Sequence, residues 1–162
     1  MGVSTLTFDK AMVIRALSRS GGTPLGSYQY GPELPDSMRK VKDTGTGVGH
    51  VYIHVDGGGD DIVGKGSGRM DRSVFDSTET AVNAIVEIMT GTQVMAALKR
   101  LDQDPQPNQQ EWLKQLPVAG DYYGFAQNSN SKNKIKTVAI NMRSHGDALF
   151  ISSCYPDSFI TP

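Results

Sequence analysis

The chain has 162 residues, with 16 Lys and Arg against 17 Asp and Glu, so its net charge is −1; this length is typical of one domain. The charge balance is not that of a strongly basic nucleic-acid binder. A single cysteine, Cys154, excludes an internal disulfide and a thiolate zinc cluster. No apolar run approaches the ~20 residues of a membrane-spanning helix, and residues 1–20 lack the pattern of a signal peptide.

Hydrophobic periodicity predicts two kinds of element. Apolar residues at helical spacing predict helices at 8–18, 77–90 and 92–101, the second of them after a capping box at 76–79. Residues 20–49 contain three Pro and many Gly and are predicted to form a loop. Alternating or β-branched residues predict antiparallel strands at 48–55, 121–126, 134–142 and 148–155. A single helical turn anchored by Trp112 is predicted at 111–116. The expected fold is α+β, with N-terminal helices packed on a curved antiparallel sheet.

A phosphate-binding loop is the first candidate site, and its pattern is incomplete. Residues 59–65 fit the GxxxxGK part of such a loop. The next residue is Gly66 where a Ser or Thr is needed for Mg²⁺, and it disfavours the helix that should follow. Asp60 and Asp61 inside the loop would repel phosphate. Nucleotide hydrolysis is therefore not predicted.

A metal site is the second candidate, because His50 and His54 stand beside the aspartates at 56, 60 and 61. No ordered calcium-binding spacing is present. On a strand the two histidines share a face but lie about 13 Å apart, at ~3.3 Å per residue. That separation is too large for one zinc ion, so no metal and no cofactor are predicted.

Acid–base chemistry is the third candidate. His145 lies in a predicted turn and is expected to be inert, whereas a histidine on the apolar segment at 48–55 is by default a structural residue. Ser153 and Tyr155 are two residues apart on the last strand and so share a face. A histidine, a cation, a hydroxyl and a phenol on adjacent strands would suit acid–base work on a phosphodiester.

Four short motifs, in order, resemble one family. They are the run His50-Val-Tyr-Ile-His54-Val55, a basic residue eleven positions on at Lys65, the step Ser73-Val74-Phe75 into a Thr- and Glu-containing helix, and the closing Ser153-Cys154-Tyr155-Pro156. Together they resemble the bacterial RNase A-like toxin domains, which form the C-terminal tips of contact-dependent growth inhibition and related polymorphic toxin proteins. The resemblance spans about residues 48–157.

The resemblance implies a fold like that of pancreatic ribonuclease without its disulfides. It also implies a metal-independent ribonuclease that cleaves RNA by transesterification to a 2′,3′-cyclic phosphate. Carried over by motif, the catalytic residues are His54, Lys65, Ser153 and Tyr155. Lys65 stands where Arg is usual and lacks the planar guanidinium of Arg, so Arg69 or Arg72 is a candidate for that role. His50 is a further candidate auxiliary residue. Lys134, Lys136 and Arg143 are the expected RNA-binding cations.

Domain boundaries, partners and location follow from the same resemblance. Residues 1–47 form an N-terminal helix and loop-rich segment, 48–157 the catalytic core and 158–162 a tail. The expected partners are an RNA substrate such as tRNA and a cognate immunity protein, with no membrane. The expected location is that of a delivered effector acting in the target-cell cytoplasm. The alternative is a non-enzymatic immunity or inhibitor protein, which would need no histidine and tyrosine in one cleft.

Overall fold

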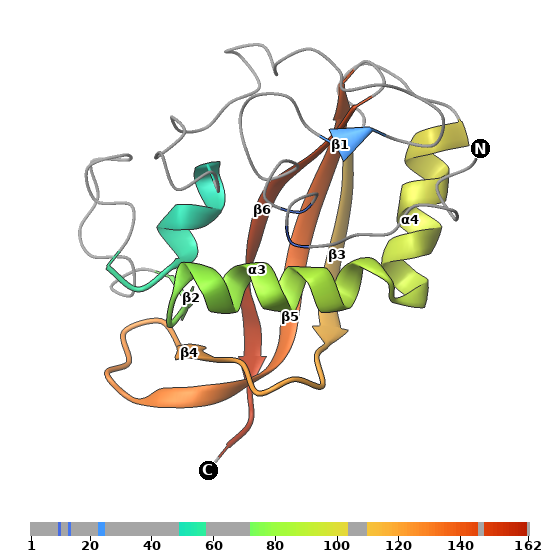
Figure 1. Cartoon of the computed structure of the whole chain (residues 1–162). Helices are drawn as coiled ribbons and strands as arrows, with labels where there is room; N and C mark the ends of the chain where they lie inside the picture. Colours follow the sequence, from blue (N-terminus) through green and yellow to red (C-terminus); the bar gives the residue numbers. More distant parts are fainter. Residues whose placement is uncertain are drawn as a thin grey trace.

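The computed structural model describes residues 10, 13, 23–24, 49–57, 72–103, 110–145 and 148–161. Within these ranges the fold is α+β (Figure 1), which confirms the predicted class. The elements in chain order are β1 (Thr23–Pro24), η3 (Gly49–His54), β2 (Val74–Phe75), α3 (Thr78–Met89), α4 (Thr92–Gln103), β3 (Gln110–Pro117), β4 (Tyr123–Phe125), β5 (Lys132–His145) and β6 (Ala148–Phe159).

The sheet is built around the β5–β6 hairpin. Its strand order is β1-β6-β5-β4-β2, and β3 also pairs with β5; every one of these pairings is antiparallel. The hairpin predicted from alternation is confirmed, with both strands longer than expected. Asn141 pairs with Ser153 and Met142 with Ile151, so Ser152 is an extra residue on β6. Such a bulge bends the strand locally.

Helices α3 and α4 cover one face of the sheet (Figure 1) and bury their apolar sides against it. The helix is capped one residue later than the predicted box at 76–79: Ser77 is the N-cap, and the Thr80 backbone N–H donates to its Oγ at 3.1 Å, which satisfies a helix-end donor. On the sheet, Ile140 and Met142 of β5 and Cys154 of β6 belong to this core. Because successive strand residues point to opposite faces, Asn141, Ser153 and Tyr155 lie on the face away from the helices.

Two predicted elements are wrong. The segment at 48–55 is not a strand: residues 49–54 form the 3₁₀ helix η3, and only Val55 makes a bridge, a parallel one with Phe75. Strand propensity mainly measures how well a side chain packs on a pleated surface, and η3 buries Val51 and Ile53 without a ladder partner.

The segment at 111–116 is not a helical turn but part of β3. The edge of β5 offers unpaired backbone groups, and β3 satisfies them from Gln110 to Pro117. Its residues alternate between exposed and half-buried positions over the first four places. Leu113 consequently packs against the core, and Trp112 lies on the other face of the sheet.

Only part of the predicted N-terminal helix is described. Lys10 and Val13 have helical backbone, and Val13 is fully buried in the core. The rest of 8–18, most of the predicted loop at 20–49 and residues 58–71 lie outside the described residues; within 20–49, only β1 and Gly49 are described. In the ranges that are described, no single helix is long and apolar enough to cross a membrane; α3 and α4 meet that test only as a pair bent by 79°.

Candidate functional site

The structure brings His54 and Tyr155 into contact. Their ring centroids lie 5.2 Å apart with the planes tilted by 36°. Both side chains are half-buried. The sequence predicted that the two side chains face one cleft from neighbouring strands; the rings do lie together, but the neighbouring strand is wrong, because His54 is at the end of η3.

Trp112 of β3 adds a third ring. Its centroid lies 6.4 Å from that of Tyr155, with the planes at 57°. Tyr155 pairs with Ala139, and Trp112 pairs with Asn141 on the other side of β5. Both rings therefore lie on the same face of the sheet, on the two sides of β5. His54, Tyr155 and Trp112 therefore form an aromatic row, a name kept below for these three residues.

Backbone and side-chain bonds fix η3 next to β6. The Asp56 backbone N–H donates to the Phe75 carbonyl at 2.8 Å, and Val51 and Val55 are buried in the core. Ser73 Oγ donates to the Pro156 carbonyl at 2.5 Å, which joins the segment before β2 to β6 directly after Tyr155. Residues 54, 73 and 155 thus converge from three separate parts of the chain.

Arg72 enters the same neighbourhood because it precedes Ser73. Its side chain is half-buried. Of the predicted auxiliary cations it is the one whose backbone position the structure establishes. Lys65 and Arg69 lie outside the described residues, so their predicted roles stay predictions.

Asn141 organises a polar network beside the aromatic row. Only 1% of it is exposed. Its Nδ2 donates to Gln110 Oε1 at 3.3 Å and to the Glu111 carbonyl at 3.4 Å. Its Oδ1 accepts from Arg143 Nε at 3.3 Å and from the Ser152 hydroxyl. Every polar atom of this buried amide is therefore used, which fixes the side chains around it.

Ser153 lies on the predicted face but is only 3% exposed. It pairs with Asn141 and stands two residues before Tyr155. The register therefore agrees with the expected grouping, while the burial leaves its hydroxyl little open surface. Its predicted role in binding phosphate stays a prediction.

Electrostatics favour a protonated phenol at Tyr155. Partial burial is the main cause that raises the pKa of this tyrosine, and the nearby Asp157 and Cys154 add to it. The phenol therefore stays a hydrogen-bond donor through neutral and mildly alkaline pH. Cys154 faces the core, and complete burial raises the pKa of its thiol far above the ordinary value; such a thiol is unreactive.

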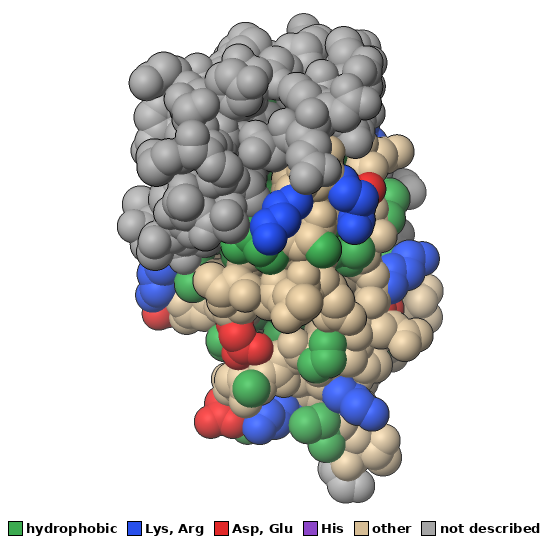
Figure 2. All heavy atoms as spheres, turned by 90° about the vertical axis from the view of Figure 1, so that its right-hand side faces the viewer, with side chains coloured by type: hydrophobic (Ala, Val, Ile, Leu, Met, Phe, Trp, Pro, Cys, Tyr) green, Lys and Arg blue, Asp and Glu red, His purple; other side chains and the backbone are tan. Residues whose placement is uncertain are grey.

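The three predicted RNA-binding cations do not form one patch. Lys134 Nζ pairs with Asp121 Oδ1 at 2.9 Å, and Lys136 is exposed. Arg143 stands at the opposite end of β5, about 30 Å from Lys134 along the strand, at ~3.3 Å per residue. Figure 2 shows one face, on which the Lys and Arg side chains occupy separate places, several of them next to Asp or Glu. Of the three, Arg143 lies beside the aromatic row.

The separation of about 13 Å expected for His50 and His54 assumed an extended strand. It does not hold, because residues 49–54 are helical. Among the residues described, no group of three His, Cys, Asp or Glu side chains could hold a metal ion. Asp60 and Asp61 lie outside those residues. His145 ends β5, where it pairs with Ala148.

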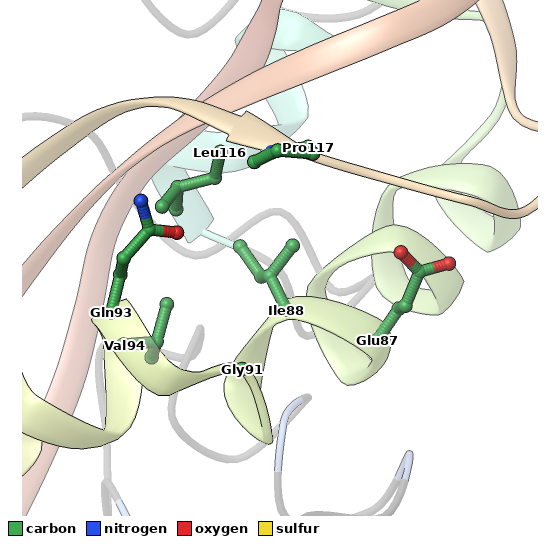
Figure 3. Close-up of a pocket in the computed structure, with 7 residues that line it drawn as sticks. All are labelled: Glu87, Ile88, Gly91, Gln93, Val94, Leu116 and Pro117. Atoms are coloured by element: carbon green, nitrogen blue, oxygen red, sulfur yellow. The ribbon is translucent and has the colours of Figure 1, made fainter.

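A separate cavity of about 150 Å³ lies between α3, α4 and β3 (Figure 3). Ile88, Val94 and Leu116 supply apolar lining. Glu87, at its rim, already accepts the backbone N–H groups of Ala119 and Gly120 at 2.8 and 2.9 Å. The cavity contains no predicted site residue, and its one carboxylate holds the chain after β3.

Trp112 and Asn141 are the residues that sequence reasoning missed. The signal for Trp112 was available, since alternating polar residues around the only Trp of the chain are also typical of a strand. For Asn141 no local signal exists, because its burial depends on strands on both sides.

No protein-family model matches the chain, and no curated protein matches its sequence. Among solved structures, the chain is similar to one in the crystal structure of the CdiA-CT/CdiI complex from Y. kristensenii 33638. That likeness has a TM-score of 0.37 and 16% identity, and it covers 56% of this chain and 76% of the other.

Proposed function

We propose that the protein is a metal-independent ribonuclease whose active centre is the His54–Tyr155 pair. The observation that carries the proposal is the 5.2 Å contact between these two rings, which joins two residues that the motif resemblance names as catalytic. Both rings keep some surface for a substrate, as both are half-buried.

The reaction is an internal transesterification. The ribose 2′-oxygen attacks the adjacent phosphorus, the bond from phosphorus to the 5′-oxygen breaks, and a 2′,3′-cyclic phosphate remains. A proton leaves the 2′-hydroxyl and another reaches the departing 5′-oxygen. An imidazole suits either transfer near neutral pH, and His54 is assigned this work. DNA has no 2′-hydroxyl and is not cleaved.

The remaining groups stabilise the phosphate. Tyr155 donates a hydrogen bond to a non-bridging oxygen, since its raised pKa keeps the phenol protonated. Lys65 and Arg72 supply positive charge to the phosphorane, and Ser153, two residues before Tyr155 on the same face, helps to orient the phosphate. The RNA substrate, with tRNA as one example, a cognate immunity protein and an effector's delivery into a target cell belong to the same proposal.

The test is incubation of the purified chain with total RNA in excess EDTA. Wild type should produce fragments with cyclic phosphate ends, and His54→Ala should lose about a hundredfold or more, the usual scale for a positioned acid or base. Lys65→Ala should also slow cleavage, and Lys65→Arg should retain or raise the rate. His145→Ala is the matched control histidine and should behave as wild type.

Two outcomes would overturn the proposal. One is intact RNA under wild type at every enzyme concentration tried. The other is His54→Ala with full activity. Intact RNA combined with tight, specific binding to a partner nuclease would make the non-enzymatic inhibitor the better assignment.

A further inference from the structure

We infer that an unpaired RNA base stacks on Trp112, so that the sheet face from Trp112 to Arg143 is a binding subsite for single-stranded RNA. The inference rests on the proposed ribonuclease function and adds to it the form of the substrate. Neither Trp112 nor this face is needed for the proton transfers assigned above.

The exposure of Trp112 is the first support. Although it lies in a paired strand, 44% of the residue is open to solvent. An indole leaves water readily and stacks on any base, because every base has a π-face. The Tyr155 ring lies beside the indole, with 6.4 Å between the two centroids. A base on Trp112 would therefore lie next to the His54–Tyr155 pair.

The neighbouring cation is the second support. Arg143 Nε is held by Asn141 Oδ1 at 3.3 Å, which limits the orientations of the guanidinium. Trp112 pairs with Asn141, and Gln110 pairs with Arg143. Trp112 and Arg143 are therefore separated by two positions on the same face, roughly 7 Å along the strands. A fixed guanidinium at this distance from a stacked base can bind a phosphate of the same strand.

The substrate form follows from what the site offers. A duplex keeps its base faces stacked inside, so an exposed indole has nothing to stack on there. Single-stranded loops and ends present unstacked bases, and aromatic side chains take them. The net charge of −1 agrees, because binding that relies on stacking depends less on a large basic surface than phosphate binding does.

The chain provides matched controls. Tyr123 is 40% exposed and Ile160 is 45% exposed. Tyr123 pairs with Lys134, and the Ile160 backbone N–H donates to the Lys134 carbonyl at 2.8 Å. Both therefore lie at the other end of the sheet from Arg143. Substitutions there test whether any exposed apolar side chain produces the same effect.

The experiment uses the single tryptophan as its own probe. The ligand is a single-stranded 2′-O-methyl RNA dodecamer, which cannot be cleaved because its 2′-oxygen carries no proton. Titration should quench Trp112 emission, and an abasic strand of equal length should not. In anisotropy titrations of a labelled dodecamer, Trp112→Leu should bind roughly fivefold to a hundredfold more weakly, Trp112→Phe should keep most of the affinity, and Tyr123→Leu should match wild type.

The outcomes separate this inference from the proposed function. Unchanged affinity of a folded Trp112→Leu, or equal quenching by the abasic strand, would overturn the stacking subsite even if wild type cleaves RNA. Quenching and weakened binding as expected would support the subsite even if natural RNA stays intact, in which case the ribonuclease proposal fails. Melting curves for Trp112→Leu and Trp112→Phe verify that both variants are folded. Should Trp112→Leu unfold, the comparison of the base-containing and abasic strands on wild type decides, because equal quenching of Trp112 by the two strands would overturn stacking.

Discussion

The imidazole of His54 and the phenol of Tyr155 lie 5.2 Å apart, although one residue ends a short helix and the other lies in the last strand. Tyr155 has two separable parts, the ring that contacts His54 and the hydroxyl that is proposed to bind the phosphate. Tyr155→Phe keeps the ring and removes the hydroxyl. We expect this variant to melt close to wild type and to cleave RNA at least tenfold more slowly, measured with a dinucleotide substrate in EDTA.

Tyr155→Ala removes both components and should lose stability as well as activity. A Tyr155→Phe variant with the full cleavage rate would show that the hydroxyl does not assist the reaction. The pH profile adds a second check: because the pKa of Tyr155 is raised, activity should not fall between pH 8 and pH 9.5 through loss of the phenolic proton.

Asn141→Ala should destabilise the fold. Its side-chain amide makes hydrogen bonds with Gln110, Glu111, Arg143 and Ser152, and only 1% of Asn141 is exposed. Its loss leaves partly buried polar groups without this partner, at a cost of about 1–3 kcal/mol. Urea unfolding measures this free energy, and the exposed Asn130→Ala should change it very little. Equal unfolding free energies for the two variants would contradict the role assigned to the network.

Glu87→Gln should loosen the segment after β3. The carboxylate accepts from the backbone of Ala119 and Gly120 and from the Tyr122 hydroxyl at 3.1 Å. A glutamine replaces one acceptor by an NH₂ group that faces a donor, so we expect a loss of about 1–3 kcal/mol. Glu79→Gln, in the first turn of the same helix, is exposed and should lose less.

The double-mutant cycle of Glu87→Gln with Tyr122→Phe refines this test. Since the two side chains are bonded, their effects should not add. Additive losses would show that the Tyr122–Glu87 bond contributes nothing to stability.

Burial first, and then Glu87, raise the pKa of Tyr122, so this tyrosine should titrate above its ordinary range.

Alkaline pH should destabilise the protein through Cys154. Burial raises the pKa of its thiol in the folded state, whereas the unfolded thiol titrates near ~8.5. Above that pH the folded state binds more protons than the unfolded state, so the free energy of unfolding falls as pH rises. Urea melts at pH 7, 8, 9 and 10 should show this slope in wild type.

Cys154→Ala should flatten the slope between pH 8.5 and 9.5 while lowering stability at neutral pH through the lost side-chain volume. The part that begins near pH 10 should persist, because Tyr122 and Tyr155 also have raised pKa values. An identical pH slope in both proteins would rule out the thiol as its source.

Helices α3 and α4 and the β5–β6 hairpin were predicted from the sequence because each carries its signal locally. The capping serine at 77 precedes a helical repeat of apolar residues, and 134–142 alternates between polar and apolar residues. Only their ends differ, since pairing extends β5 to His145 and β6 to Phe159. The motif resemblance also selected His54 and Tyr155 as partners, although it assumed the wrong element for the histidine.

The sequence by itself determined the α+β class, and the motif resemblance named His54 and Tyr155, whose contact only the structure shows. The tertiary structure decided that 49–54 is a helix, that 110–117 is a strand, and that Trp112 and Asn141 stand beside Tyr155. The reason is physical: periodicity within a segment states which side chains will be buried, but not what will bury them. Pairing of β3 with the edge of β5 places Trp112 next to Tyr155. No residue near Trp112 in the sequence indicates that it will have this neighbour.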